Sequence, residues 1–178
     1  MTAPSSRSLL VVTVPGGQRV EPAMSGDVVA LHRLRRQLED WLHDKGVRQW
    51  PRGEVSQDEI AAQVSRQEWH LARHSEVGVA AAMRMLWSDP DFWGEDSTPA
   101  VYVHGLMVDR AMAGLGMGAL MLDRAAEVGR DRSVGVFRLD CAESNSALRS
   151  YCRKQGFHES GRCDFDDLFS VTLFEKEI

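Results

Sequence analysis

The segment 103–125, VHGLMVDRAMAGLGMGALMLDRA, constrains the fold most, because it changes from strand to turn to helix in one short run. Its first part is apolar and partly β-branched, which is typical of a buried strand. Gly114, Gly116 and Gly118 then alternate, and apolar side chains recur at helical spacing from Met117 onward. A strand, a glycine turn and a helix in this order bring backbone N–H groups together at a helix N-terminus. Such a concavity favours an anion such as a pyrophosphate.

The spacing of these glycines excludes the commoner nucleotide-binding loops. GLGMG does not match the GxGxxG of dinucleotide-binding folds, and no GKS or GKT follows to complete a phosphate loop of the Walker type. Taken alone, the loop fits an ordinary strand–turn–helix junction about as well as an anion site.

The remaining patterns predict one α+β domain over residues 1–178, with a mixed sheet of about seven strands flanked by about four helices. Residues 1–7 are small and polar, so we expect them to be disordered. The segment 88–100 is a turn-rich loop. Helices are expected at 25–45, 56–66, 117–130 and 146–155. Strands are expected at 9–14, 68–73, 77–87, 101–108, 134–141, from 157, and 168–174.

Composition limits the functional classes. The net charge of -5 argues against a nucleic-acid partner, since phosphate backbones require a basic surface. No apolar run approaches the ~18 residues that a membrane span requires, so no membrane partner is expected. Cys141, Cys152 and Cys163 show no CxxC or metal-ligand spacing, which predicts reduced thiols, no metal site and a cytoplasmic location.

Two motifs together resemble the GNAT superfamily, the acyl-CoA-dependent N-acyltransferases. The first is Leu106-Met107-Val108 followed, five residues later, at 114–118 by the GLGMG turn with its Gly116-x-Gly118 pair. The second is NSALRSYCRKQGF at 145–157. The order of elements is similar over nearly the whole chain. The resemblance implies a mostly antiparallel central sheet and acetyl-CoA as the acyl donor.

The resemblance also implies which residues bind that donor. The strand before the turn splays from its neighbour, so that the main chain of Met107 and Val108 pairs with the pantetheine arm and the acyl oxygen. Asn145 hydrogen-bonds the same arm. The pyrophosphate lies on a run of six residues, Ala113, Gly114, Leu115, Gly116, Met117 and Gly118.

The chain departs from the family pattern at two positions. Ala113 stands where the family usually has Arg or Gln, which predicts weaker binding of the phosphate groups. Cys152 stands where the family has a tyrosine, and the tyrosine of this chain, Tyr151, lies one residue earlier. One step along a helix turns a side chain by about 100°, so Tyr151 does not simply replace the missing tyrosine.

Acyl transfer to an amine requires a base for the ammonium and can use an acid for the leaving thiolate. His104 is the candidate base, because an imidazole of ordinary pKa, about 6.5, titrates near neutrality. Three alternatives remain open for the acid: Tyr151 reaches by its length, Cys152 or a water donates, or no acid is needed. A purely structural role for His104 in the sheet and for Cys152 in the core is the competing interpretation.

The resemblance implies that the acceptor, a small-molecule or peptide amine, binds at the first two helices with the loop between them, here 36–54, and at the loop 88–97. The candidates for an aromatic wall are Trp41, Trp50, Trp87, Phe92 and Trp93, and the candidates for attracting a cationic amine are Asp89, Asp91, Glu95 and Asp96. The competing functions are a non-catalytic acyl-CoA-binding module and an acyltransferase with another donor. A homodimer is possible.

Overall fold

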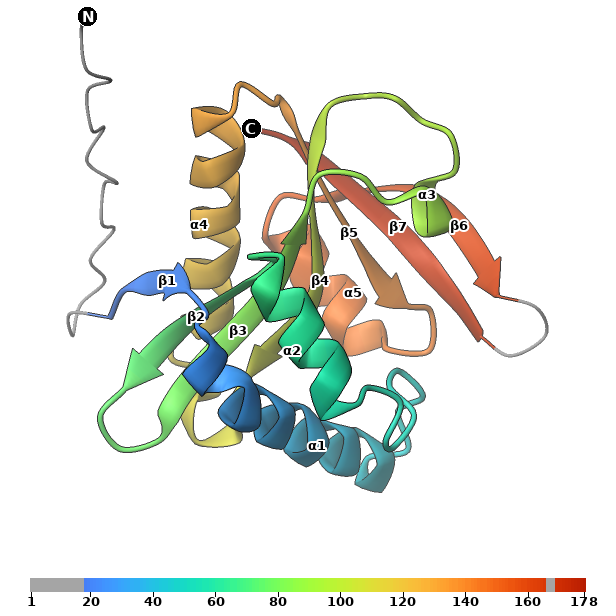
Figure 1. The fold of residues 1–178 in the computed structure, drawn as a ribbon. Coiled ribbons are helices and arrows are strands. Elements are labelled where there is room, and N and C mark those ends of the chain that lie inside the picture. The colour runs from blue at the N-terminus through green and yellow to red at the C-terminus, as the bar shows by residue number, and fades with distance from the viewer. Residues whose placement is uncertain (1–17, 166–168) are drawn as a thin grey trace, which may run out of the picture.

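The computed structural model describes residues 18–165 and 169–178. Figure 1 shows a sheet with helices on both faces. The helices are α1 (Val28–Asp44), α2 (Gln57–Ser65), α3 (Pro90–Trp93), α4 (Met117–Asp131) and α5 (Ser146–Lys154), with short 3-10 turns η1 (Ser25–Asp27) and η2 (Arg110–Met112). The strands are β1 (Val20–Pro22), β2 (Trp69–His74), β3 (Gly78–Leu86), β4 (Ala100–Val108), β5 (Val136–Ala142), β6 (His158–Phe165) and β7 (Phe169–Glu177).

The seven strands form a single sheet in the order β1-β2-β3-β4-β5-β7-β6. Every neighbouring pair is antiparallel except β4 and β5. The predicted α+β class with a mostly antiparallel sheet is therefore confirmed. The four expected helices are α1, α2, α4 and α5.

Two details differ from the sequence expectations. The 88–100 segment contains the one-turn helix α3, because Pro90 at its first position fixes a helical φ. The strand expected at 9–14 and the disorder expected at 1–7 lie outside the described residues. The first strand that the structure describes is β1, which pairs over only three residues and gives little pattern to recognise.

Side chains at the ends of the helices explain where they begin and stop. Ser56 caps α2 by accepting from the Glu59 N–H at 3.1 Å, and Asn145 caps α5 by accepting from the Leu148 N–H at 3.1 Å. Gly156, with φ +84°, follows α5 in the left-handed conformation that ends many helices. These short-range signals are why the predicted helix limits hold to within a few residues.

Two hydrophobic clusters cover the two faces of the sheet. One packs α4 and α5 against the central strands, around the fully buried Met83, Met121 and Phe137. The other packs α1 and α2 against the opposite face, around Leu31 and Ile60. Each helix buries one apolar stripe, as its 3.6-residue period requires.

A β-bulge in β4 positions the site. Arg84 of β3 pairs with His104 and Ala82 pairs with Met107, so one residue of β3 faces two of β4. Gly105 sits in the bulge with φ +57°. The bulge bends the strand just where its pairing with β5 ends.

The two parallel strands separate at their C-terminal ends. Pairing between β4 and β5 runs from Ala100 with Val136 to Val103 with Leu139 and goes no further. Figure 1 shows the two strands diverging beyond that point, with α5 near the opening. The backbone of β4 from His104 onward is thereby freed on its β5 side.

Candidate active site

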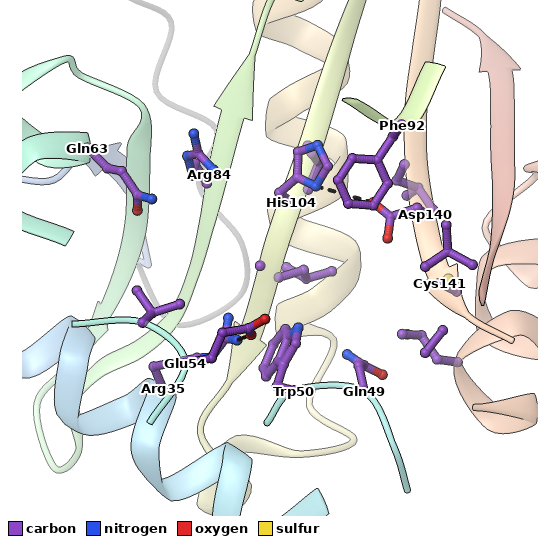
Figure 2. A pocket seen from close by; sticks show the side chains of 18 of the residues that line it. Arg35, Gln49, Trp50, Glu54, Gln63, Arg84, Phe92, His104, Asp140 and Cys141 are labelled. Atoms are coloured by element: carbon purple, nitrogen blue, oxygen red, sulfur yellow. Dashed lines mark hydrogen bonds and ion pairs between the residues drawn. The ribbon is translucent and has the colours of Figure 1, made fainter. Parts of the chain in front are cut away.

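A pocket of about 430 Å³ opens between the diverging strands (Figure 2). One wall is β4 around His104 and the other is β5 around Asp140 and Cys141. The segment between α1 and α2 supplies Trp50 and Glu54 on a third side. The volume suits a small-molecule site, and both polar and apolar side chains line it.

His104 is held between two carboxylates. Its Nε2 lies 2.8 Å from Oδ2 of Asp89, which precedes α3, and its Nδ1 lies 3.2 Å from Oδ1 of Asp140. The Phe92 ring packs against the imidazole, with centroids 5.0 Å apart. Only 17% of the His104 side chain is exposed. Burial lowers the pKa of His104, but the hydrogen bonds and charges of Asp140 and Asp89 outweigh it and raise that pKa to about 9.

The raised pKa changes the role expected for His104. The sequence suggests an imidazole of ordinary pKa, whereas the folded chain holds an imidazolium at neutral pH. Both ring nitrogens face carboxylate oxygens, so both donate. The cluster of one cation and two anions carries an excess negative charge, which suits a cationic amine nearby.

The two candidate acids lie in different places. Cys152, on the buried face of α5, lines the pocket together with His104. Tyr151 points elsewhere: a Cβ added to Gly118 would lie 2.7 Å from the Tyr151 hydroxyl oxygen, so the phenol lies against the first turn of α4. Burial raises the pKa of Tyr151. Of the two, the structure brings only Cys152 to the pocket with His104.

The glycine turn has the geometry expected for an anion site. Gly114 and Gly116 have φ of +78° and +81°, and a Cβ at either would enter open space. Gly116 precedes α4 and, unlike the caps of α2 and α5, provides no side-chain acceptor for the first-turn N–H groups. Ala113 ends η2 and begins the turn, and Leu115 at its tip is 67% exposed. A helix that starts without a side-chain cap presents its N–H groups to an anion.

Met107 and Val108 lie on the part of β4 that β5 leaves unpaired. Met107 is fully buried and packs with α1 and α2, and neither Met107 nor Val108 lines the pocket, so a ligand would have to reach their main chain from the side that β5 leaves open. Met117 and Gly118 begin α4 at the same end of the sheet.

Asn145 already has two partners. Its Oδ1 caps α5, and its Nδ2 donates to Oε1 of Gln49 at 2.6 Å. The neighbouring Ser144 hydroxyl donates to the Arg48 carbonyl at 2.8 Å. The segment between α1 and α2 is thus fastened to the start of α5, and a ligand at Asn145 would have to replace Gln49.

The acceptor side is built differently from the expectation. Trp50 and Phe92 line the pocket, but Trp41, Trp87 and Trp93 do not and instead lie under the guanidinium groups of Arg110, Arg132 and Arg138. Among the four acids of the 88–96 segment, Asp89 reaches His104 and Asp96 binds Arg138 at 2.7 Å. Sequence spacing does not reveal which aromatic faces the pocket, because each packs against elements distant in the chain.

A buried ion pair shapes the floor below Trp50. Arg35 of α1 lies 2.9 Å from Glu39 and 2.9 Å from Glu54, and its guanidinium stacks on Trp50, 3.9 Å from the ring. Glu39 is fully buried and also accepts from the Gly53 N–H at 2.9 Å. Burial raises the pKa of the Glu54 carboxyl, which faces the pocket.

Sequence reasoning missed Asp140, Arg35 and Glu54. One signal points to Asp140: a carboxylate in the run VFRLDCA would be costly in a buried strand unless it is paired. Its partner, His104, lies on the neighbouring parallel strand, one position past the last paired residues of both strands. Nothing in the local sequence distinguishes Glu54 from the other acids around it.

Comparisons with known proteins identify the family. The family model described as acetyltransferase (GNAT) family matches residues 35–157. An uncharacterized N-acetyltransferase, YesJ of Bacillus subtilis, is 31% identical over 172 residues, covering 93% of each chain. The chain belongs to the GNAT family of acetyltransferases.

Solved structures show the same fold. A GNAT-family acetyltransferase from Listeria monocytogenes has a TM-score of 0.76 at 28% identity, covering 93% of this chain and 98% of that one. The PaiA N-acetyltransferase of Thermoplasma acidophilum, solved in complex with coenzyme A, has a TM-score of 0.68 at 13% identity, covering 90% and 99%.

Within residues 18–165 and 169–178, no helix is long and apolar enough to cross a membrane. Within the same ranges, His, Cys, Asp and Glu side chains form no group of three or more that could hold a metal ion.

Proposed function

We propose that this protein transfers the acetyl group of acetyl-CoA to a primary amine, by direct attack of the amine while both substrates are bound. The observation that carries the proposal is the opening between β4 and β5. It has the uncapped N-terminus of α4 near one end and the negatively charged His104 cluster at the other. An anionic donor and a cationic acceptor would each find a complementary charge.

The residues present fit acetyl-CoA. At Gly114 and Gly116 the backbone lies open, so that the pyrophosphate can approach the N–H groups of the turn. Those of Ala113 and Leu115 already donate to the carbonyls of Arg110 and Met112 at 3.3 Å, so the remaining N–H groups of 113–118 would bind the anion. The main chain of Met107 and Val108 is free to pair with the pantetheine arm and to donate to the acyl oxygen, where charge develops. Acetyl-CoA supplies an activated thioester with a stable thiolate as its leaving group.

The amine must lose its proton before it attacks. The pKa of about 9 makes the neutral form of His104 a minor species at neutral pH in the free protein. An ammonium that binds beside Asp140 places a like charge next to the imidazolium and lowers the pKa of His104. Binding of the acceptor would thus help to release the proton from His104, which could then accept the proton of the amine.

The thiol of Cys152 would donate to the departing thiolate. It lines the pocket, whereas the Tyr151 hydroxyl lies against α4. That position of Tyr151 favours a second candidate function, a module that binds acyl-CoA without transferring the acyl group, if a thiol cannot replace the phenol.

Calorimetric titration with acetyl-CoA, with CoA and ATP as controls, tests the donor, and a panel of primary amines scored by thiol release tests the reaction. We expect acetyl-CoA and CoA to bind and ATP not to bind, and thiol release with at least one amine. Binding without transfer to any amine would favour the binding module. Absence of acetyl-CoA binding would contradict the proposed donor and favour an acyltransferase with a different one.

A further inference from the structure

Two of the three thiols meet inside the pocket. Cys141 lies near the end of β5 and Cys152 on the inward face of α5, and their sulfur atoms are 3.2 Å apart. Both residues are almost completely buried within the protein, yet both line the pocket. Figure 2 shows Cys141 on the β5 side, beside Asp140. Cys163, on β6, lies apart from this pair and contacts the Asp91 carbonyl.

The proposed reaction does not require this pair. Protonation of a leaving thiolate needs at most one donor, and a thiol makes only weak hydrogen bonds, so the contact does little for stability. A disulfide bond is about 2.05 Å long, so a relative movement of about 1 Å between α5 and β5 would bring the sulfur atoms to bonding distance. Disulfides in a reducing compartment are usually transient and catalytic or redox-sensing.

We propose that Cys141 and Cys152 form a reversible dithiol–disulfide pair in the wall of the pocket, oxidised by low-molecular-weight disulfides that enter through the pocket. One thiolate attacks a sulfur of the small disulfide, forms a mixed disulfide and expels one small thiol. The second cysteine, as thiolate, attacks the protein sulfur of the mixed disulfide and expels the other small thiol. The protein loses two protons and two electrons, and the oxidant becomes two thiols.

The surroundings make this exchange slow and dependent on pH. Contact with the Cys152 thiol raises the pKa of Cys141 most, and burial raises it further. Asp140 adds to that effect through its charge, whereas Arg149 opposes it. Because only thiolates exchange, the rate of oxidation should increase with pH, and a ligand that fills the pocket should slow it.

Oxidation would remove the S–H of Cys152 and fasten α5 to β5. If the proposed function is correct, the oxidised protein loses acetyl transfer and regains it with a reductant. This consequence rests on the proposed role of Cys152, whereas formation of the disulfide does not.

The test incubates the folded protein with bis(2-hydroxyethyl) disulfide, quenches the mixture by alkylation in denaturant and measures intact mass. The expected product has lost two hydrogen atoms from Cys141 and Cys152, and neither of these two is alkylated, while Cys163 is either alkylated or carries one small thiol. Cys141→Ser and Cys152→Ser should each prevent the intramolecular bond, and Cys163→Ser, the matched control, should still form it. Acetyl-CoA should slow the reaction in the unsubstituted protein.

Three alkylated thiols after a treatment that oxidises a reference dithiol would overturn the proposal. A product in which Cys152 carries only the small thiol, with Cys141 still free, would overturn it equally. Each measurement is a mass, so it does not depend on acetyl transfer. If the disulfide forms but the fully reduced protein transfers no acetyl group to any amine, the pair is established and the proposed function is refuted.

Discussion

The charge of His104 is set by residues that are distant in the sequence. Asp89 approaches from the start of α3 and Asp140 from β5, and each contacts one ring nitrogen. Neither carboxylate is adjacent to His104 in the chain, so the pKa of about 9 is a property of the folded protein. The activity of a base with that pKa should increase with pH up to about 9.

Replacement of Asp140 by Asn tests whether His104 is the base. Loss of one opposite charge should lower the pKa of His104 by about 1 to 3. The rising, low-pH side of the pH–kcat/KM profile should move to lower pH by the same amount as the pKa that NMR titration gives for the ring. Asp91→Asn, at an exposed acid of α3, should change neither quantity. A lowered NMR pKa with an unmoved rate profile would count against His104 as the base.

Glu39 is a second residue whose importance depends on burial. It is fully buried, with Arg35 and the Gly53 N–H as partners, whereas its neighbour Asp40 is paired with Arg52 at the surface. Glu39→Ala leaves a buried guanidinium with only Glu54, and should lower the free energy of unfolding by about 3–5 kcal/mol. Asp40→Ala should cost less than about 1 kcal/mol. Urea unfolding of both variants measures these losses. Equal losses would show that the buried ion pair contributes no more to stability than the exposed one.

At the scale of elements, local signals and packing determine different things. The apolar stripes of α1 and α4 and the caps of α2 and α5 are encoded within a few residues, so these helices are predictable. The bulge at Gly105 and the end of the β4–β5 pairing depend on contacts between strands, and sequence alternation does not locate them.

Gly116→Ala tests the glycine turn, with Gly78→Ala as a matched control. Both glycines have positive φ and open space around a built Cβ, but Gly78 lies at the start of β3. Each substitution should destabilise the fold by about 1–2 kcal/mol, because both force alanine into the left-handed region. Only Gly116→Ala should weaken acetyl-CoA binding, by at least about tenfold (about 1.4 kcal/mol) in calorimetry. Equal affinities in the two variants would refute the assignment of the loop.

At the scale of the whole molecule, two histidines give stability a maximum near pH 6.5. The pKa of His104 is raised to about 9, so its contribution is complete below 6.5 and is lost as the pH increases toward 9. Burial lowers the pKa of His70, on β2, to about 4, so its contribution is complete above 6.5 and is lost as the pH decreases toward 4.

A plot of stability against pH therefore has two limbs, a loss above pH 6.5 from His104 and a loss below it from His70. Each loss should amount to about 3 kcal/mol in the free energy of unfolding, since one pKa unit corresponds to about 1.36 kcal/mol. Urea unfolding across this pH range measures both limbs. His104→Gln should remove the loss above pH 6.5 and keep the loss below it, and His70→Leu should do the reverse. Loss of both limbs in either variant would mean that other groups cause the pH dependence.

The sequence alone was enough to predict the α+β class, the four main helices and the glycine turn before α4. It also pointed to the GNAT family, because these features depend on periodicity, turn residues and motif spacing within short segments. The assembly of the site, by contrast, became visible in the folded structure. The fold placed Cys152 rather than Tyr151 at the pocket, brought Asp89 and Asp140 to His104, and brought the sulfur atoms of Cys141 and Cys152 to 3.2 Å from each other. The physical reason is that pKa values, side-chain direction and pocket lining depend on burial and on neighbours from other elements, which meet only when the sheet has formed.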